Sequence, residues 1–456
     1  MSGLTILKMA WRNLWRQKRR TILTLISIVF GGFFAVMLTA TQDYTWVDFI
    51  DSTARMGSGH ITVQHPEYMD KPTLTRTVTG TDGKRATVKT DEDVSVAVER
   101  TTGQAMLATA HDSYGAFFIA YDPTQETEYT QDWNEGVCRP TATAPTEDQV
   151  DACMAARESA ACGEIAECEW GLKKLLAGEL FTEPDQKGII LGKVLAENLE
   201  AEIGDKVVFT LTDRSGEIVS GMERVKGVID TGADTTDAAI SLLPIGAVRD
   251  VVGYDPTEST QVAIFLNNGR RTLTVSERVE KLIGGETAVL TWDEIQPEIK
   301  TFIAMKKGGG AVMSIVLGIL VAAGIFNTIF MSVMERTREF GIMIAIGYSP
   351  RQLFSVVMAE SAIFATLGLL LCAAVTAGPY LWLNKNGMDM TAMYQSMGME
   401  SMDISGVGFD PVMPFGVFPE NMLAIVLAIM GACMLAGLYP AWKAGRVEPV
   451  ESINLV

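Results

Sequence analysis

The sequence predicts an α-helical membrane protein with four transmembrane helices and a large extracytoplasmic α+β domain. Of its 456 residues, 48% are hydrophobic, yet 20% are charged and the formal net charge is −18. The apolar residues are therefore segregated rather than mixed, and they fall into four blocks, each long enough to cross a bilayer as a helix. Residues 44–307, which carry strand and turn signals, separate the first block from the second.

The four apolar blocks define the expected membrane spans. Neither Thr21–Ala40 nor Gly308–Met334 contains a charged residue, and each is long enough for a hydrocarbon core about 30 Å thick. Leu353–Leu383 carries only Glu360, and Asn421–Ala441 carries no charge. We therefore expect transmembrane helices at residues 21–43, 308–334, 353–383 and 421–441.

The distribution of charge predicts the orientation. Residues 1–20 contain six basic residues and no acid, which places them in the cytoplasm by the positive-inside rule. Four spans return the tail, residues 442–456, to the same side. Residues 44–307 hold 44 acids against 25 bases, so the acidity lies outside the membrane. An acidic exterior argues against nucleic acid as a partner.

Residues 1–20 are expected to form an amphipathic helix along the cytoplasmic membrane surface. Apolar residues recur at helical spacing, and a second stripe of bases faces anionic membrane lipid. These residues are Leu4, Leu7, Trp11, Leu14 and Trp15, flanked by Lys8, Arg12, Arg16 and Arg19. The helix is either a topology anchor or a mechanical part. A cleaved signal peptide is the alternative, but the apolar run is long for one and residues 44–55 continue in helical register.

Residues 44–307 are expected to form the extracytoplasmic domain with stalk helices at both ends. His60–Gln64 alternates as a strand does, and Thr291–Lys307 is typical of a helix that leads into the second span. Residues 123–171 have the composition of an insertion. It contains Cys138, Cys153, Cys162 and Cys168, which predicts two disulfides with three possible pairings. A metal site is the alternative, but no Cys-x-x-Cys pair is present and no histidine lies among them, so we expect no metal.

The exterior loop at residues 384–420 is rich in methionine. Thioethers bind soft ions such as Cu(I), so copper handling is one interpretation. A flexible apolar surface at the membrane border is the interpretation that we favour. The methionines are Met388, Met390, Met393, Met397, Met399, Met402 and Met413.

No set of catalytic residues is recognisable, so the chain is not predicted to be an enzyme. The nearest match to a phosphate-binding loop, Gly188–Lys193, has the wrong glycine spacing and is followed by Val194 instead of Ser or Thr. Energy for work on a cargo would have to come from another chain. The cytoplasmic loop at residues 335–352 places Phe340, Ile342 and Ile346 among charges and glycines, as a helix that docks into a partner would. An ordinary interfacial turn is the alternative.

Several stretches resemble a known family. MERTREFGIMIAIGYSPRQLFSVVMAESAI and the ending YPAWKAGRVEPVESI closely resemble the FtsX-like permease domain of the MacB and lipoprotein-releasing (LolC/LolE) ABC transporters. WRNLWRQKRRT, GHITVQHPEY, IILGKVLAENLEAEIGDKV and VLTWDEIQPEI also resemble these proteins. The resemblance covers most of the chain except the cysteine-containing insertion.

The resemblance implies the type VII ABC permease architecture and a multi-pass protein of the bacterial inner membrane with both ends cytoplasmic. In this family two permease chains, identical or related, pair with two ATPase subunits (LolD-like), which hold ATP and magnesium; no cofactor is expected on this chain. ATP-driven closure is relayed to the periplasmic domain, an arrangement called mechanotransmission. The implied ATPase-coupling residues are Glu335, Arg336, Thr337, Arg338, Glu339, Phe340, Gly341, Ile342, Ala345, Gly347 and Tyr348.

Lipoprotein-releasing members extract a lipid-anchored protein between the first two helices and pass it to a periplasmic chaperone (LolA-like). This implies a cargo cavity lined by Phe30, Phe33, Phe34, Met37, Val316, Ile319, Ala323 and Phe326. Glu360, an intramembrane polar residue, is expected either to have a partner or to snorkel. Two alternatives stay open: MacB-like tripartite efflux of peptides or small molecules, and FtsX-like signalling that activates a cell-wall hydrolase. MacB carries its ATPase on the same chain, whereas this sequence contains no ATPase motif.

Overall fold

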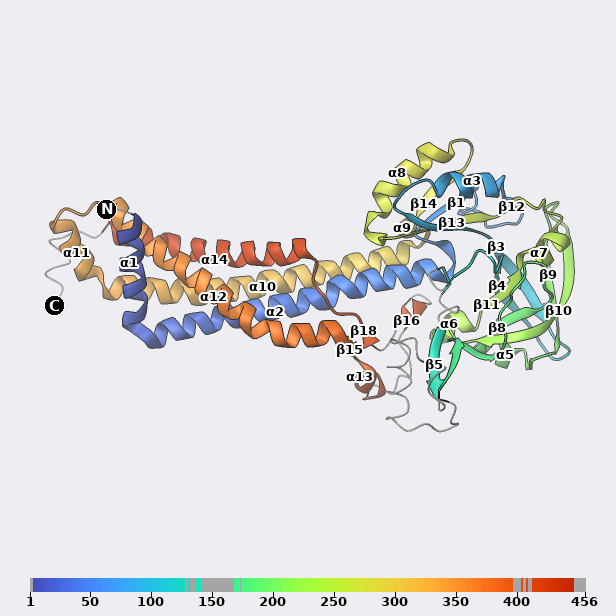
Figure 1. Cartoon of the computed structure of the whole chain (residues 1–456), viewed down its shortest axis with the longest axis horizontal. Coiled ribbons are helices and arrows are strands. Elements are labelled where there is room, and N and C mark those ends of the chain that lie inside the picture. The colour runs from blue at the N-terminus through green and yellow to red at the C-terminus, as the bar shows by residue number, and fades with distance from the viewer. Residues whose placement is uncertain are drawn as a thin grey trace. The chain divides into compact units, whose positions relative to one another are not determined.

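The computed structural model describes residues 3–127, 130–131, 136–140, 168–172, 174–396, 403–404, 407–408 and 412–446. The chain divides into two compact units (Figure 1). Unit 1 comprises Met1–Trp46, Phe302–Asp389 and Val412–Val456, and unit 2 comprises Val47–Thr301 and Met390–Pro411. The chain passes from one unit to the other within two of its long helices.

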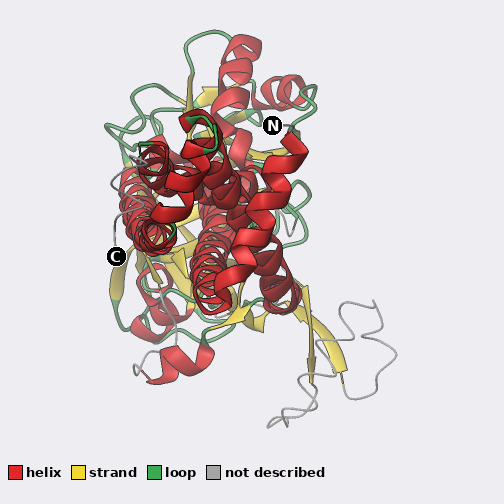
Figure 2. Ribbon diagram, turned by 90° about the vertical axis from the view of Figure 1, so that its left-hand side faces the viewer, coloured by secondary structure: helices red, strands yellow, loops and turns green. Residues whose placement is uncertain are grey.

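Unit 1 is helical, and it confirms the expectation of four long apolar helices. Four helices in the described part of the chain are long and apolar enough to cross a membrane. Their axes are nearly parallel, with successive helices running in opposite directions, and Figure 2 views them close to end on. They are α2 (Lys18–Thr53), α10 (Pro297–Glu335), α12 (Pro350–Asn386) and α14 (Pro419–Gly445). Each extends beyond the apolar run from which it was predicted.

Shorter elements complete unit 1. The helix α1 (Gly3–Leu14) is followed by one 3₁₀ turn (Trp15–Gln17), and α11 (Thr337–Ala345) connects α10 to α12. The strands β15 (Met388–Asp389) and β18 (Val412–Met413) pair with each other. The amphipathic helix expected over residues 1–20 is therefore shorter, and one face of it, with Ala10 and Leu14, is buried.

Small residues allow the long helices to approach closely. A Cβ atom at Gly32 of α2 would lie 2.6 Å from the Cys372 Sγ of α12, and one at Gly368 of α12 would lie 2.6 Å from the Ile28 Cγ2 of α2. Ile28 is fully buried in a cluster that also contains Ile325 of α10. Because lipid is as apolar as leucine, close van der Waals packing of this kind is the main attraction between membrane helices.

The starts of α12 and α14 are fixed by specific caps. Ser349 and Gln352 form a reciprocal capping box at the start of α12, and Pro350 occupies its first turn. The start of α14 is held by Asp43 of α2, whose carboxylate accepts the Phe418 backbone N–H and the Asn421 side-chain amide. A carboxylate is favoured at a helix N-terminus, where backbone N–H groups lack partners.

Unit 2 is built around one ten-stranded mixed sheet. The strand order is β14-β1-β13-β3-β4-β11-β8-β10-β7, and β9 pairs with both β10 and β3. The strands are β1 (Ile61–Gln64), β3 (Val94–Ala108), β4 (Ser113–Tyr121), β7 (Leu175–Gly178), β8 (Ile189–Gly192), β9 (Lys206–Thr212), β10 (Ile218–Ile229), β11 (Ile240–Pro244), β13 (Gln261–Leu266) and β14 (Ala288–Thr291). The predicted α+β content of this segment is confirmed.

Helices cover the sheet and connect its strands. They are α3 (Thr81–Val88), α5 (Lys193–Asn198), α6 (Asp234–Asp237), α7 (Ile245–Val252), α8 (Thr272–Ile283) and α9 (Trp292–Ile295), with α13 (Thr391–Ser396) in the second segment of the unit. The helix expected over Thr291–Lys307 is interrupted at Gln296, which has φ −122° and ψ 72°. Pro297 disfavours a helical conformation of the residue before it, so α10 starts anew there.

A fully buried ion pair joins the end of α2 to the sheet within unit 2. Arg100 of β3 donates to both carboxylate oxygens of Glu126, at 2.8 and 2.9 Å. It also donates to the Gly57 carbonyl at 2.7 Å, and Gln261 of β13 donates to the same carbonyl at 3.0 Å. Gly57 belongs to the π-helical turn Ala54–Ser58 that follows α2. The last turn of the helix is thereby fastened to two neighbouring strands.

Only part of the cysteine-containing insertion is described. Cys153 and Cys162 lie outside the described residues, whereas Cys138 and Cys168 lie in the paired strands β5 (Gly136–Pro140) and β6 (Cys168–Leu172). The register pairs Cys138 with Trp170 and Cys168 with Pro140, so these two cysteines do not lie opposite each other. The two disulfides stay a prediction.

Four further short strands were not predicted individually. The strands β2 (Val78–Thr79) and β12 (Glu258–Ser259) pair, as do β16 (Asp403–Ile404) and β17 (Val407–Gly408). Of the loop methionines, Met397, Met399 and Met402 lie outside the described residues. The described histidines, cysteines and acids contain no cluster of three that could hold a metal ion.

Two glycines of α12 provide a matched test of the helix packing. Replacement of either by alanine gains about 1 kcal/mol of helix propensity. At Gly368 the new methyl group would meet Ile28, whereas at Gly378 it would meet nothing within 4 Å. We expect Gly368→Ala to lower the free energy of unfolding in detergent by about 1–3 kcal/mol and Gly378→Ala to leave it unchanged or raise it. Equal effects of the two substitutions would contradict the close contact between α2 and α12.

Candidate functional site

The helix α11 forms a short elbow between two long helices. It follows α10 after the single residue Arg336. The hydroxyl of Thr337, its first residue, donates to the Met334 carbonyl in the last turn of α10. The helix α11 ends at Ala345, and two residues later Gly347, whose φ of +103° suits glycine, turns the chain toward α12. There the Tyr348 backbone N–H donates to the Met343 carbonyl at 3.0 Å. The predicted docking loop is therefore an ordered helix with defined ends.

The two sides of α11 differ in burial. Phe340 is fully buried and packs in a cluster with Leu14 of α1, Leu353 of α12 and Ala444 of α14. On the other side, Ile342 is 44% exposed, and Ile346, directly after the helix, is 73% exposed. One side thus attaches the helix to unit 1, and the other presents isoleucine side chains outward.

A buried polar network lies beneath α11. Arg336 donates to the Glu360 carboxylate of α12 at 3.0 Å, and both side chains are less than a tenth exposed. The Asn13 amide of α1 donates to the same carboxylate at 2.7 Å. Arg336 also pairs with Glu339 of α11 at 3.2 Å and lies over the Phe340 ring. A buried ion pair is stable only when further hydrogen bonds satisfy its members, and Asn13 and Glu339 supply them.

Two ion pairs that are more exposed join α11 and the end of α10 to the start of the chain. Arg16, just after α1, pairs with Glu339, and Arg20 of α2 pairs with Glu335. Partial burial alone would raise the pKa of Glu339, but hydrogen bonds from Arg16 and Arg336 outweigh it and hold this pKa below its ordinary value. Glu339 therefore stays ionised at neutral pH and keeps both pairs. Exposed pairs of this kind contribute little stability individually, so their main effect is to fix orientation.

The structure brings together three of the eleven predicted coupling residues. Arg336, Glu339 and Phe340 lie in one cluster with Glu360, which was singled out separately. Arg338 and Ala345 are exposed, and Gly341 is buried. Asn13 was missed, and Arg16 was expected to face lipid. The helical spacing of Asn13 and Arg16 indicates that they share a face. It does not indicate that α11 lies opposite that face.

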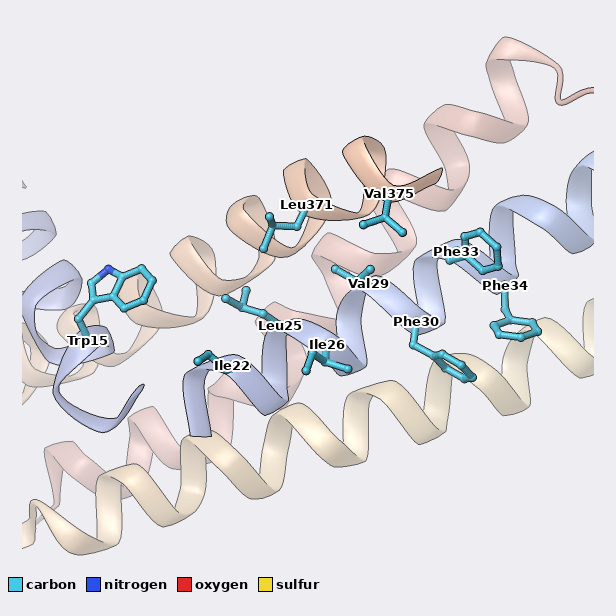
Figure 3. A pocket seen from close by; sticks show the side chains of 10 residues that line it. All are labelled: Trp15, Ile22, Leu25, Ile26, Val29, Phe30, Phe33, Phe34, Leu371 and Val375. Carbon is cyan, nitrogen blue, oxygen red and sulfur yellow. The ribbon is translucent and has the colours of Figure 1, made fainter. Parts of the chain in front are cut away.

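An apolar pocket of about 680 Å³ lies against α2 in unit 1 (Figure 3). Phe30, Phe33 and Phe34, three of the predicted cavity residues, line it. The facing wall comes from Leu371 and Val375 of α12 rather than from α10. The remaining lining residues are Trp15, Ile22, Leu25, Ile26 and Val29.

The other predicted cavity residues do not line this pocket. Met37 packs with Val36 and Phe415 in a separate cluster. Val316, Ile319 and Ala323 of α10 are exposed. Phe326 of α10 stacks on Phe330 at a centroid distance of 5.6 Å. Within this chain, the residues predicted on α2 and α10 thus form separate surfaces.

Comparison with known proteins finds a family match for part of the helical unit. Residues 311–449 match the family described as FtsX-like permease C-terminal, and this part of the chain is an FtsX-like permease domain. The chain is 24% identical over 295 residues to the "Lipoprotein-releasing system transmembrane protein LolC" of Xylella fastidiosa, which covers 62% of this chain and 68% of that protein. It is 24% identical over 305 residues to the "Macrolide export ATP-binding/permease protein MacB" of Nitrobacter winogradskyi, covering 62% of this chain and 41% of that protein.

A solved structure is also similar to this chain. The periplasmic region of MacB from Actinobacillus actinomycetemcomitans is 13% identical and covers 54% of this chain and 95% of that one, with a TM-score of 0.32. A TM-score this low does not establish a shared fold.

The buried pair beneath α11 predicts a specific pattern of stability. Glu360→Leu leaves Arg336 buried without its main acceptor, so we expect it to lower the free energy of unfolding by about 3–5 kcal/mol. The double variant Arg336→Met/Glu360→Leu removes both charges and should recover most of that loss. Chemical unfolding of the purified protein in detergent measures both.

The exposed Arg338 offers a control for this cycle, because Arg338→Met should change the free energy of unfolding by less than about 0.5 kcal/mol. If the double variant were no more stable than Glu360→Leu alone, the pair would not be the interaction that holds α11 in place.

Proposed function

Because residues 311–449 form an FtsX-like permease domain, we propose that this chain is the permease subunit of an ABC transporter in a bacterial inner membrane, and that α11 couples it to a separate ATPase subunit. The observation that carries the proposal is the division of α11 into an anchored and an exposed side. A helix that transmits force needs a rigid attachment to its own subunit and an apolar surface for its partner. Phe340 with the Arg336–Glu360 pair provides the first, and Ile342 with Ile346 provides the second.

The polarity of the bundle follows in this proposal from the same assignment. The end of unit 1 that carries α1, α11 and the last turn of α14 faces the cytoplasm, and unit 2 is periplasmic. ATP and magnesium bind to the ATPase, and a second permease chain, identical or related, completes the complex. Force on α11 reaches α10 directly through the one-residue connection at Arg336, and it reaches α1 and α12 through the polar network.

The continuous helices α2 and α10 support a mechanical relay. Each runs without interruption through its apolar run and on toward unit 2, so a tilt at one end is transmitted along a hydrogen-bonded rod. Within unit 2, the Gly57 carbonyl at the end of α2 is held by Arg100 and Gln261. The sheet therefore follows the helix, which is the behaviour that mechanotransmission requires.

For the cargo we propose a lipid-anchored protein that is extracted for transfer to the outer membrane. The similarity to LolC favours this reading, and the apolar pocket against α2 is suited to acyl chains. A periplasmic chaperone would then receive the cargo. MacB-like efflux of peptides or small molecules is the second candidate, favoured by the similarity to MacB. Signalling to a cell-wall hydrolase is the third.

The exposed side of α11 can be tested by introducing a charge. We expect Ile346→Glu to leave the permease folded and inserted but to lower permease-stimulated ATP hydrolysis by more than about tenfold, because a buried carboxylate at the interface has no counter-charge. Leu273→Glu, at a 69% exposed leucine on α8, is the matched control and should have no effect. Unchanged hydrolysis in a stable Ile346→Glu complex would contradict the docking assignment.

Photo-crosslinking can identify the cargo. A benzoylphenylalanine at Phe30 is expected to capture peptides that carry acyl chains, whereas the same probe at Leu435, a 72% exposed residue of α14, should capture only lipid. Mass spectrometry of the crosslinked peptides distinguishes the three candidates. An adaptor or a hydrolase among the co-purifying proteins, with no acylated peptide at Phe30, would replace lipoprotein release by the corresponding alternative.

A further inference from the structure

A groove of about 530 Å³ separates α1 from α12 in unit 1. Its walls are apolar: Leu7 and Trp11 come from α1, and Ala362, Ile363 and Leu367 come from α12. Thr366 also lines it, but its hydroxyl already donates to the Ala362 carbonyl. Lys8 is the one charged residue among the described residues that line the groove. Apolar side chains and a single ammonium group thus line the same groove.

Lys8 in the groove and Arg12 beside it differ from the other bases near the start of the chain. Arg16 and Arg20 are paired with Glu339 and Glu335. In the described residues, no acid lies within ion-pair distance of Lys8 or of Arg12, one turn further along the same side of α1. Residues 1–20 also contain no acid. The positive charge at the groove is therefore not neutralised by this part of the protein.

We propose that this groove is a binding site for one anionic phospholipid, with an acyl chain along the apolar walls and the phosphodiester at Lys8. The occupant is a lipid because the α12 wall, residues 362–367, belongs to an apolar run of a membrane-spanning helix and faces hydrocarbon. The headgroup is anionic because a zwitterionic lipid brings its own cation next to Lys8 and Arg12. Each basic residue near a membrane surface favours an anionic headgroup by about 1 kcal/mol.

The site joins the same two helices as the polar network. Asn13 of α1 donates to Glu360 of α12, one turn from Ala362 and Ile363 in the groove wall. A lipid that contacts both helices therefore stabilises the position of α1 beside the anchor of α11. This role does not depend on which cargo the complex handles.

Native mass spectrometry of the delipidated, purified full chain provides the test. Phosphatidylglycerol and phosphatidylcholine with identical acyl chains are titrated separately. We expect tighter binding of one phosphatidylglycerol per chain, and Lys8→Gln should weaken it about fivefold. Arg19→Gln is the matched control, because it removes a base from the same segment at a position that does not line the groove. Thr366→Trp fills the groove and should weaken binding of both lipids.

Four outcomes would overturn the site. Equal affinity for the two lipids would remove the anionic preference, and equal effects of Lys8→Gln and Arg19→Gln would show general attraction rather than a site. Undiminished binding in Thr366→Trp, with thermal unfolding like that of the wild type, would place the lipid elsewhere. Soluble glycerol phosphate serves as a competitor, and displacement by it would show that the apolar walls are not involved.

Discussion

The arrangement of helices around α11 depends on the buried ion pair between Arg336 and Glu360. Arg336 is the only residue between α10 and α11, and Glu360 lies about three turns inside α12. The pair therefore holds the junction of α10 and α11 against α12. Taking two charges out of water costs several kcal/mol per ion, and attraction offsets this only when the remaining hydrogen-bonding groups are satisfied. Because Asn13 meets that need, α1 becomes part of the same joint.

The same constraint explains why α11 can present apolar residues outward without loosening. Phe340 lies under the Arg336 guanidinium and within the cluster formed by α1, α12 and α14. The attachment of the helix is therefore complete on one side, and Ile342 and Ile346 are not needed for it. Both isoleucines therefore stay available for the partner contact proposed above.

The four long helices could be predicted from the sequence because an uncharged run of twenty or more residues has few alternatives to a membrane span. Sheet order could not, since β3 pairs with the neighbouring strand β4 but also with β9 and β13, which are distant from it in the sequence. For Glu360 the sequence left two options open, a partner or snorkelling. Its partners lie 24 and 347 positions away, beyond any local pattern. Phe30 lines an apolar pocket whose facing wall comes from α12, and the close approach of α2 and α12 at Gly32 and Gly368 depends on packing between segments that no local pattern encodes.

The glycine contacts and the ion pair constrain α12 in complementary ways. Gly32 and Gly368 set the separation of α2 and α12 by direct contact, because a methyl group at either position would meet the opposite helix. Such a contact resists approach but permits sliding and tilting. The ion pair, by contrast, holds one end of α12 to α11 and α1. The helices of unit 1 are therefore held together at the end near α11. Along the rest of α2 and α12, the glycine contacts fix only the distance between the two helices. Beyond the last turn of α2, the Gly57 carbonyl accepts hydrogen bonds from Arg100 and Gln261, so within unit 2 this end of the helix is fixed to two neighbouring strands.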